Sequence, residues 1–412
     1  MNTHRYSLIL LAGLLTADVA AQVTSTPVTL RIDPAQSQGA PVSSVFESVE
    51  FIPLETNRES LFGQIHSMRV IKDRFIIHDR ETNAVLIFGS DGKFLHKIAG
   101  SRLGKGGTHR GTISSFSADP ENATILLKEG SRQFYYGTDG KFLREDTLGF
   151  INSEEAPLGQ DAVARVLYDP GPQYPDTTCN ELFVTRGHSV IAGYFPYQRQ
   201  SAEIHPIDYI HISHASFYPA GMNGAYFFTR PYDYNVYRIS ATGMDTAFRV
   251  KLPLQHTLPP GFLKDPALKN TRFQYLMNHP DFVFHIGNVY TFGNLLFFKL
   301  ATVNGGLKHN DSFVMELNSG RLVSVNQLIP DAASHFLPVT DDANGVEFVN
   351  SNFLDASEGY LYTNYAAVTL FGYQAESASK QAEYPAKLAS WFQKGNKKAN
   401  PVIIKLKPKQ QL

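Results

Sequence analysis

Glycines and cationic side chains gather in one short segment of the sequence, residues 100–111. The segment holds five glycines together with Arg102, Lys105, His109 and Arg110. Glycines let backbone N–H groups converge on an anion, and nearby cations would reinforce its binding. The segment lacks the Gly-Lys-Ser/Thr ending of a phosphate loop. We predict that it is a ligand-binding loop, and the alternative is a flexible connection between structural elements.

Two other segments combine aromatic rings with arginine, residues 194–199 and 226–234. Such surfaces suit stacking on sugars or the capture of peptide side chains. Half or more of these rings are expected to pack inside the fold instead. The candidate ligand-binding residues from the two segments are Tyr197, Arg199, Arg230 and Tyr232.

Metal chemistry finds little support in the sequence. His205, His211 and His214 lie near Asp208, but their spacing matches no standard zinc pattern. The acidic stretch at residues 341–347 does not have the spacing of an EF-hand loop. The single cysteine, Cys179, excludes an intramolecular disulfide and a cysteine-based zinc site. We therefore expect no cofactor, with a calcium or zinc site as the open alternative.

Catalytic signatures are also absent from the sequence. No Gly-x-Ser-x-Gly elbow occurs, which argues against a serine hydrolase of that type. Aspartate and glutamate are scattered, and no rule of spacing selects a pair for glycoside cleavage. The formal net charge of -1 argues against nucleic-acid binding, because such proteins usually carry a strong basic excess.

The first 21 residues are typical of an export signal. A weakly positive start precedes an apolar run over residues 6–15, and Val-Ala-Ala follows at residues 19–21. Gln22 stands where a bacterial lipoprotein would carry cysteine, so no lipid anchor is expected. No other segment reaches the ~20 apolar residues that a membrane helix needs. We predict a signal peptide at 1–21 and one domain over 22–412, in the periplasm or secreted.

Hairpin-like repeats recur along this domain. An apolar run, an Asp-Gly turn and a second run occupy residues 84–95, and the pattern returns at residues 133–143. Asp91 and Asp139 lie 48 residues apart. Asp-Gly between two strand-like runs is a strong hairpin signal. Related hairpins are predicted to turn at Gly187, Gly243 and Gly320.

A repeat of ~40–50 residues with about four short strands is typical of a propeller blade. We therefore predict an all-β fold, a single six-bladed β-propeller, with seven blades as the alternative count. Residues 254–281 are expected to be an inserted loop or short helix, and residues 386–394 a short helix near the C-terminus. Residues 48–54 are expected to pair with late strands, so that terminal strands close the ring.

Three segments carry a resemblance to a known family. The segments are Val-Glu-Phe-Ile-Pro-Leu-Glu-Thr at 49–56, the hairpin at 85–95 and Asn-Pro-Val-Ile-Ile-Lys-Leu at 400–406. They resemble the six-bladed propellers, of TolB-like or NHL-like architecture, that are common among secreted proteins and lipoproteins of Bacteroides-type bacteria. The resemblance covers nearly the whole mature chain and implies an architecture rather than a reaction. Residues 100–111 lack the Pro-Gly-Glu core that family members tend to carry after the first blade.

These observations lead to a functional expectation. We expect an exported, non-catalytic propeller that binds a glycan, a peptide or an envelope protein at the mouth of its central channel. The alternative is a carbohydrate-active hydrolase or lyase with carboxylates or a metal at the axis. A cluster of Asp, Glu or His at the axis would favour the enzyme, whereas aromatic rings and arginine without such a cluster would favour binding.

Overall fold

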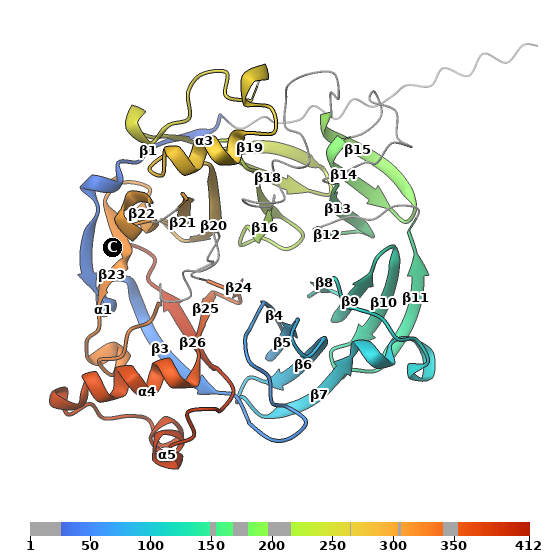
Figure 1. Ribbon diagram of the computed structural model, residues 1–412, viewed down its shortest axis with the longest axis vertical. Helices are drawn as coiled ribbons and strands as arrows, with labels where there is room; N and C mark the ends of the chain where they lie inside the picture. Colours follow the sequence, from blue (N-terminus) through green and yellow to red (C-terminus); the bar gives the residue numbers. More distant parts are fainter. Residues whose placement is uncertain are drawn as a thin grey trace, which may run out of the picture.

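Six β-sheets stand around a central axis as the blades of a propeller (Figure 1). The computed structural model describes residues 26–148, 154–167, 180–196, 216–263, 265–303, 306–340 and 353–412. The predicted all-β fold of six blades is confirmed. The predicted signal peptide, residues 1–21, lies outside the described residues and stays a prediction.

The first three blades follow one another in sequence. Blade 1 consists of β4 (Ser67–Ile71), β5 (Arg74–Asp79), β6 (Ala84–Gly89) and β7 (Phe94–Ala99). Blade 2 consists of β8 (Ser115–Asp119), β9 (Thr124–Glu129), β10 (Arg132–Gly137) and β11 (Phe142–Thr147). Blade 3 consists of β12 (Glu155–Gly159), β13 (Ala162–Val166), β14 (Asn180–Arg186) and β15 (Ser189–Pro196). Within each blade the four strands are antiparallel neighbours in chain order.

The last three blades also use strands from the N-terminal part of the chain. Blade 4 consists of β16 (Ser216–Pro219), β17 (Tyr226–Thr229), β18 (Asn235–Ser240), β19 (Gly243–Lys251) and the parallel outer strand β1 (Val28–Arg31). Blade 5 consists of β20 (His285–Phe292), β21 (Leu295–Ala301), β22 (Ser312–Glu316), β23 (Leu322–Ile329) and the parallel outer strand β2 (Gln38–Pro41). Blade 6 consists of β24 (Asp355–Ser357), β25 (Tyr360–Tyr365), β26 (Val402–Pro408) and β3 (Phe46–Pro53).

The repeated glycine turns occupy equivalent places in the blades. All five predicted turns connect the third strand of a blade to its fourth strand. In blades 1 and 2 the aspartate before the glycine accepts the amide of the following lysine, at 3.0 Å for Asp91 and 3.1 Å for Asp139. Gly92 has φ +77°, and a Cβ there would lie 2.4 Å from the Pro53 carbonyl oxygen, so only glycine fits. The 48-residue spacing therefore reflects one hairpin repeated from blade to blade.

The ring closes where β3 pairs with β26. The two strands are antiparallel, with Ile52 opposite Ile403, so blade 6 joins the two ends of the domain (Figure 1). Fully buried Asn400 secures this joint: its side-chain nitrogen donates to the carbonyls of Glu55 and Ser60 at 2.7 and 2.9 Å. Its side-chain oxygen accepts the Phe62 amide at 3.0 Å. The predicted closure by terminal strands is confirmed.

We expect Asn400→Ala to lower the free energy of unfolding by about 2 kcal/mol, because it leaves buried backbone groups without partners. Urea titration followed by circular dichroism measures the change. The matched control is Asn396→Ala, an exposed residue whose side chain accepts only the Lys398 amide. Equal stability of the two variants would show that Asn400 does not hold the ring closed.

Helices lie outside the ring of sheets (Figure 1). The predicted helix over residues 386–394 is confirmed as α5 (Ala386–Lys394), and the predicted insertion contains α3 (Arg272–Asn278). The sequence did not predict α4 (Ala367–Glu376), where Phe371 stacks on Trp391 of α5 at 4.7 Å between ring centroids. A single turn, α1 (Val42–Val45), links β2 to β3. Short 3-10 turns are η1 (Pro34–Gln36), η2 (Gly100–Arg102), η3 (Lys105–Gly107), η4 (Leu254–His256), η5 (Pro266–Leu268), η6 (Gly306–His309), η7 (Ala332–Ser334) and η8 (Ala378–Lys380).

Apolar side chains fill most of the spaces between blades. Strand faces alternate, so each sheet can present one apolar face to each of its neighbours. The largest cluster joins blades 4, 5 and 6, and includes Phe297, Phe313 and Phe353. Across the described ranges, no helix is both long enough and apolar enough to cross a membrane.

Candidate functional site

The innermost strands of all six blades surround a cavity of about 690 Å³ on the propeller axis. This volume lies within the range of small-molecule sites. Side chains alternate along a strand, so a polar residue on an innermost strand can point at the axis. Each blade contributes at least one polar residue to the lining, and in blade order these are Arg69, Asp119, Glu154, Tyr226, Tyr290 and Asp355.

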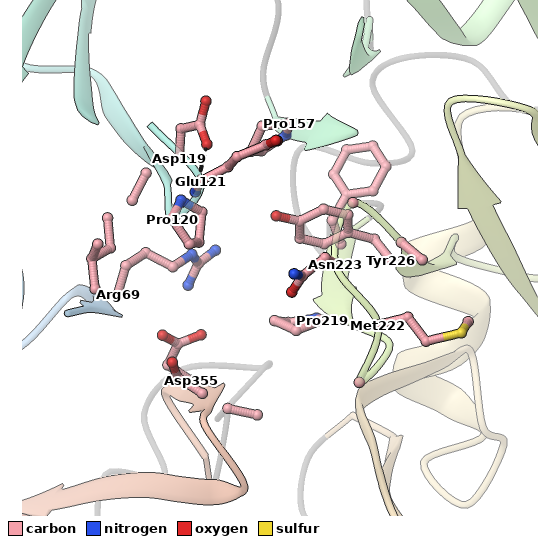
Figure 2. A pocket seen from close by; sticks show the side chains of 18 of the residues that line it. Arg69, Asp119, Pro120, Glu121, Pro157, Pro219, Met222, Asn223, Tyr226 and Asp355 are labelled. Atoms are coloured by element: carbon pink, nitrogen blue, oxygen red, sulfur yellow. Dashed lines mark hydrogen bonds between the residues drawn. The ribbon is translucent and has the colours of Figure 1, made fainter. Parts of the chain in front are cut away.

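Arg69 on β4 places a positive charge inside this cavity. Its guanidinium extends into the open space, with Asp355 below it and Tyr226 and Asn223 facing it from blade 4 (Figure 2). One guanidinium nitrogen, Nη1, donates to the Met68 carbonyl at 2.9 Å, the only hydrogen bond that the described residues give this side chain. Burial opposes its charge, but Asp355, Tyr290 and Glu154 outweigh burial and raise its pKa. Arg69 therefore stays cationic and keeps donors for a ligand.

Asp355 on β24 supplies an acceptor next to this cation. Asp355 is only 3% exposed, and its Oδ2 accepts a hydrogen bond from the Val70 amide at 2.7 Å. Its Oδ1 has no hydrogen-bond partner in the described structure. Burial raises the carboxyl pKa from 3.8 to about 6, against the attraction of Arg69 and the amides of Val70 and Ala356. A buried carboxylate oxygen without a partner is costly, which points to an absent partner.

Glu154 and two tyrosines complete the polar lining. Burial raises the pKa of Glu154, although Arg69 and Lys128 act in the opposite direction. Burial also raises the pKa of Tyr226 and Tyr290 well above the usual value, so both phenols stay protonated. The cavity thus combines a permanent donor, carboxyl acceptors and phenol hydroxyls. This set suits a ligand that both donates and accepts hydrogen bonds.

The structure does not describe the residues that the sequence suggested for metal binding. Among the described residues, no three His, Cys, Asp or Glu side chains come together to hold an ion. The histidines at 205, 211 and 214 with Asp208, the acidic stretch at 341–347 and Cys179 all lie outside the described residues. The open alternative of a calcium or zinc site stays untested.

Comparison with family models shows to which protein family the chain belongs. A family model described as "Domain of unknown function (DUF4934)" matches residues 28–407. The chain belongs to the DUF4934 family. The match covers every strand from β1 to β25 and almost all of β26. No protein with a curated function matches this DUF4934 chain in sequence.

Solved structures resemble the DUF4934 propeller in fold. A putative exported protein from Bacteroides fragilis is 17% identical with a TM-score of 0.68, covering 93% of this chain and 100% of its own. A DUF4221 family member from Bacteroides vulgatus is 11% identical with a TM-score of 0.41, covering 68% of this chain and 84% of its own. A streptogramin B lyase is 10% identical with a TM-score of 0.36, covering 69% of this chain and 74% of its own. The first of these likenesses supports the six-bladed fold.

The glycine-rich loop of this DUF4934 chain lies away from the axial cavity. It connects β7 of blade 1 to β8 of blade 2, and none of its residues lines the cavity. His109 is held inside the loop: Nε2 lies 2.5 Å from Glu129 Oε2, Nδ1 lies 2.8 Å from Arg132 Nη1, and the ring stacks on Phe134. Four of the five glycine amides bond to other protein atoms. These contacts describe a packed connection between blades, with three exposed cations, Arg102, Lys105 and Arg110.

The predicted aromatic and arginine candidates are also separate from the cavity. Arg230 Nη2 lies 2.6 Å from Glu181 Oε2, and its guanidinium covers the Phe195 ring at 4.5 Å. Tyr232 is only 7% exposed and packs on Phe262 in an apolar cluster. A surface role in ligand capture therefore does not fit Tyr232, because its ring is enclosed. Tyr197 and Arg199 lie outside the described residues, and their role stays a prediction.

The axial residues were missed by the sequence reasoning, although a signal existed. Arg69 interrupts an otherwise largely apolar strand, Ser-Met-Arg-Val-Ile. A charge in the middle of the first strand of a blade lies on the strand nearest the axis. Tyr226 belongs to the aromatic segment at 226–234, but Arg230 and Tyr232 were chosen from it. Reading the first strand of every blade for polar residues would have found Arg69 and Asp355.

Proposed function

We propose that this protein is an extracytoplasmic, non-catalytic binding propeller that holds a glycan in its axial cavity. The observation that carries the proposal is the pairing of Arg69, which has unused donors, with Asp355, whose Oδ1 has no partner. Both groups belong to the same cavity but come from different blades. The predicted signal peptide supports a location outside the cytoplasm.

A hydroxyl-rich, uncharged ligand matches these groups. A sugar hydroxyl both donates and accepts, so neighbouring hydroxyls can accept from Arg69 while they donate to Asp355. Tyr226 adds an aromatic ring and a phenol hydroxyl at the opposite wall (Figure 2). The lining holds more carboxyl groups than cations, so the cavity offers no surplus of positive charge to an anionic ligand. The cations are Arg69 and Lys72, and the carboxyl groups are those of Asp119, Glu121, Glu154, Glu155, Asp355 and Glu358. A peptide or an envelope protein is the competing partner, and the test below distinguishes them.

One observation favours a second candidate, a carbohydrate-active hydrolase or lyase. Burial places the pKa of Asp355 at about 6, and it also raises that of Glu154. Carboxyl groups with raised pKa are suited to general acid catalysis. Incubation of each bound glycan with the protein, followed by product analysis, tests this candidate. Shortened or unsaturated products would identify an enzyme, and unchanged glycan supports binding without catalysis.

We expect Arg69→Met to weaken glycan binding about 10- to 100-fold, because it removes charged hydrogen bonds at the centre of the cavity. A glycan array identifies binders of the purified protein, and isothermal titration calorimetry then compares wild type with the variant. The matched control is Arg249→Met, an exposed arginine on β19 at the periphery. Circular dichroism confirms that both variants are folded.

The outcomes separate the candidate partners. Binding lost in Arg69→Met but kept in Arg249→Met supports the axial glycan site. Binding by peptides alone would replace the glycan with a peptide partner. A glycan that binds both variants equally would place the site elsewhere and overturn the proposal.

A further inference from the structure

Among the described residues, the space between blades 2 and 3 differs from the other spaces between blades. In the described part of the chain, apolar clusters join blades 1 and 2, blades 3 and 4, blades 4 to 6, and blades 6 and 1. No such cluster joins blades 2 and 3 among the described residues. Adjacent propeller blades normally bury apolar faces against each other. This interface must therefore be held by other contacts.

Buried charges replace the apolar contacts there. Lys128 on β9 lies 2.8 Å from Glu155 of β12, and Arg165 of β13 binds the same carboxylate oxygen. The side chains of these three residues are at most 6% exposed. Ser117 donates to the other Glu155 oxygen at 2.8 Å, and Arg165 Nε donates to Thr185 at 3.1 Å. The two blades are thus joined by a polar cluster across their interface.

An open cleft of about 630 Å³ lies beside this cluster. It extends from the inner strands to the outer strand β11 and the hairpin between β14 and β15, where Leu143, Arg144 and Gly187 line it. The cleft adjoins the axial cavity, and six residues line both. These shared residues are Ser117, Ala118, Asp119, Glu155, Pro157 and Gly159.

A buried donor in this cleft lacks a partner. Gln133 on β10 is 1% exposed, and its Oε1 accepts the Tyr135 hydroxyl at 2.9 Å. Its Nε2 has no hydrogen-bond partner in the described structure. Both side chains line the cleft, and Arg144 covers one face of the Tyr135 ring at 3.5 Å. An unpaired buried amide donor costs about 1–3 kcal/mol, so an acceptor oxygen from a ligand would restore what is missing.

We propose that the cleft between blades 2 and 3 is a second subsite of the axial cavity, and that the ligand is an oligosaccharide long enough to occupy both. This inference rests on the proposed glycan-binding function. One end of the oligosaccharide lies at Arg69 and Asp355, and its following sugar units pass Ser117 and Glu155 towards Gln133. The cleft lining holds charges of both signs, with three arginines, Arg144, Arg165 and Arg186, and four carboxyl groups, Asp119, Asp146, Glu155 and Asp161. Such a lining suits a neutral, hydroxyl-rich oligosaccharide better than an ion. A single sugar fills the axial subsite only.

Chain length is the variable that tests this inference. The probes are cello-, xylo-, manno- and malto-oligosaccharides, each from the monosaccharide to the hexasaccharide, titrated into the full protein by calorimetry. We expect affinity to rise at least about tenfold once the chain is long enough to enter the cleft, which is the gain expected from a second polar subsite. Arg69→Met should weaken binding of short and long chains alike.

Two variants restrict the cleft without touching the axis. Gln133→Leu removes the unpaired donor, and we expect it to weaken only the long chains, about 3- to 10-fold. Val163→Trp places a large ring in the cleft, which Val163 lines, and should abolish the advantage of length. The matched control is Gln274→Leu on the exposed side of α3. Circular dichroism and thermal unfolding confirm that each variant is folded.

The results separate this inference from the proposed function. One result would keep the axial site and overturn the cleft subsite. In that result oligosaccharides bind and Arg69→Met weakens their binding, but neither oligosaccharide length nor the two cleft variants change the affinity. If no series binds, or if Arg69→Met has no effect on binding, the proposed function falls and the subsite falls with it. Loss of binding to long chains in the control variant as well would also contradict the subsite.

Discussion

Replacing Asp355 with asparagine should stabilise the folded protein near neutral pH by about 2 to 3 kcal/mol. The folded protein holds this carboxyl at a pKa of about 6, whereas its ordinary value is 3.8. Between these values the folded state binds a proton that the unfolded chain has released. Stability from this group is therefore highest below pH 3.8 and is lost as the pH rises through about 6. Asparagine is always neutral, and it keeps an oxygen for the Val70 amide.

Urea titrations of wild type and Asp355→Asn at a series of pH values measure this effect. The difference between the two curves isolates Asp355, because other groups titrate in both proteins. His78 is one of these groups, because burial lowers its pKa from 6.5 to about 4. The stability that His78 contributes to the folded protein therefore falls as the pH falls, whereas the stability contributed by Asp355 rises. The control is Asp265→Asn, an exposed cap of η5 that asparagine replaces equally well. A difference curve without slope between about pH 4 and pH 6 would contradict the prediction.

The same substitution should weaken glycan binding at least about tenfold, because an amide donor replaces one acceptor beside the Arg69 donors. A residue that destabilises the fold while it improves binding is expected at a functional site. If the variant is more stable than wild type and binds the glycan equally well, Asp355 only destabilises the fold and takes no part in binding. Loss of both stability and binding would make it a structural residue.

Local signals explain why the fold was predictable from the sequence. Five of the six blades contain the same hairpin between their third and fourth strands, and a turn such as Asp91 and Gly92 specifies its own geometry within four residues. The outer strands β1 and β2 gave no such signal. They are four residues long and pair in parallel with β19 and β23, which lie about two hundred or more positions away in the sequence. Helix α4 was missed because Val368, Thr369 and Gly372 are weak helix formers, and packing against α5 overrides that tendency.

The candidate axial site was harder to predict, because closure of the ring brings its residues together. Arg69 and Asp355 lie 286 positions apart, and each is the only charged residue in its own strand. The sequence reasoning looked instead for polar residues that cluster locally. In this chain such clusters stabilise their surroundings, as His109 does with Glu129 and Arg230 does with Glu181. In these two examples, polar residues that are close in the sequence make packing contacts. A residue's position within its blade is the signal that places Arg69 and Asp355 near the axis.

Glu155→Gln should cause the largest loss of stability of any substitution considered, about 3 to 5 kcal/mol, because it removes the buried carboxylate that binds both Lys128 and Arg165. Burial raises the pKa of the Glu155 carboxyl, but the two cations outweigh burial and hold it below the usual value. The stability that the Glu155 carboxylate gives wild type is thus fully present when the pH is above its ordinary pKa of 4.5. This stability is lost as the pH falls through the lowered pKa. Urea titration at neutral and acidic pH measures both effects.

The control for this substitution is Asp245→Asn, which breaks the more exposed pair with Arg238 and should change stability by less than about 1 kcal/mol. A second variant, Glu155→Gln with Lys128→Met, removes one stranded cation and should recover part of the loss. No apolar cluster joins blades 2 and 3 among the described residues, and the contacts of Glu155 with Lys128 and Ser117 connect the two blades beside the cleft. Glu155→Gln should therefore also remove the preference for long chains at neutral pH. A variant as stable as wild type would show that neither the blades nor the cleft depend on these charges.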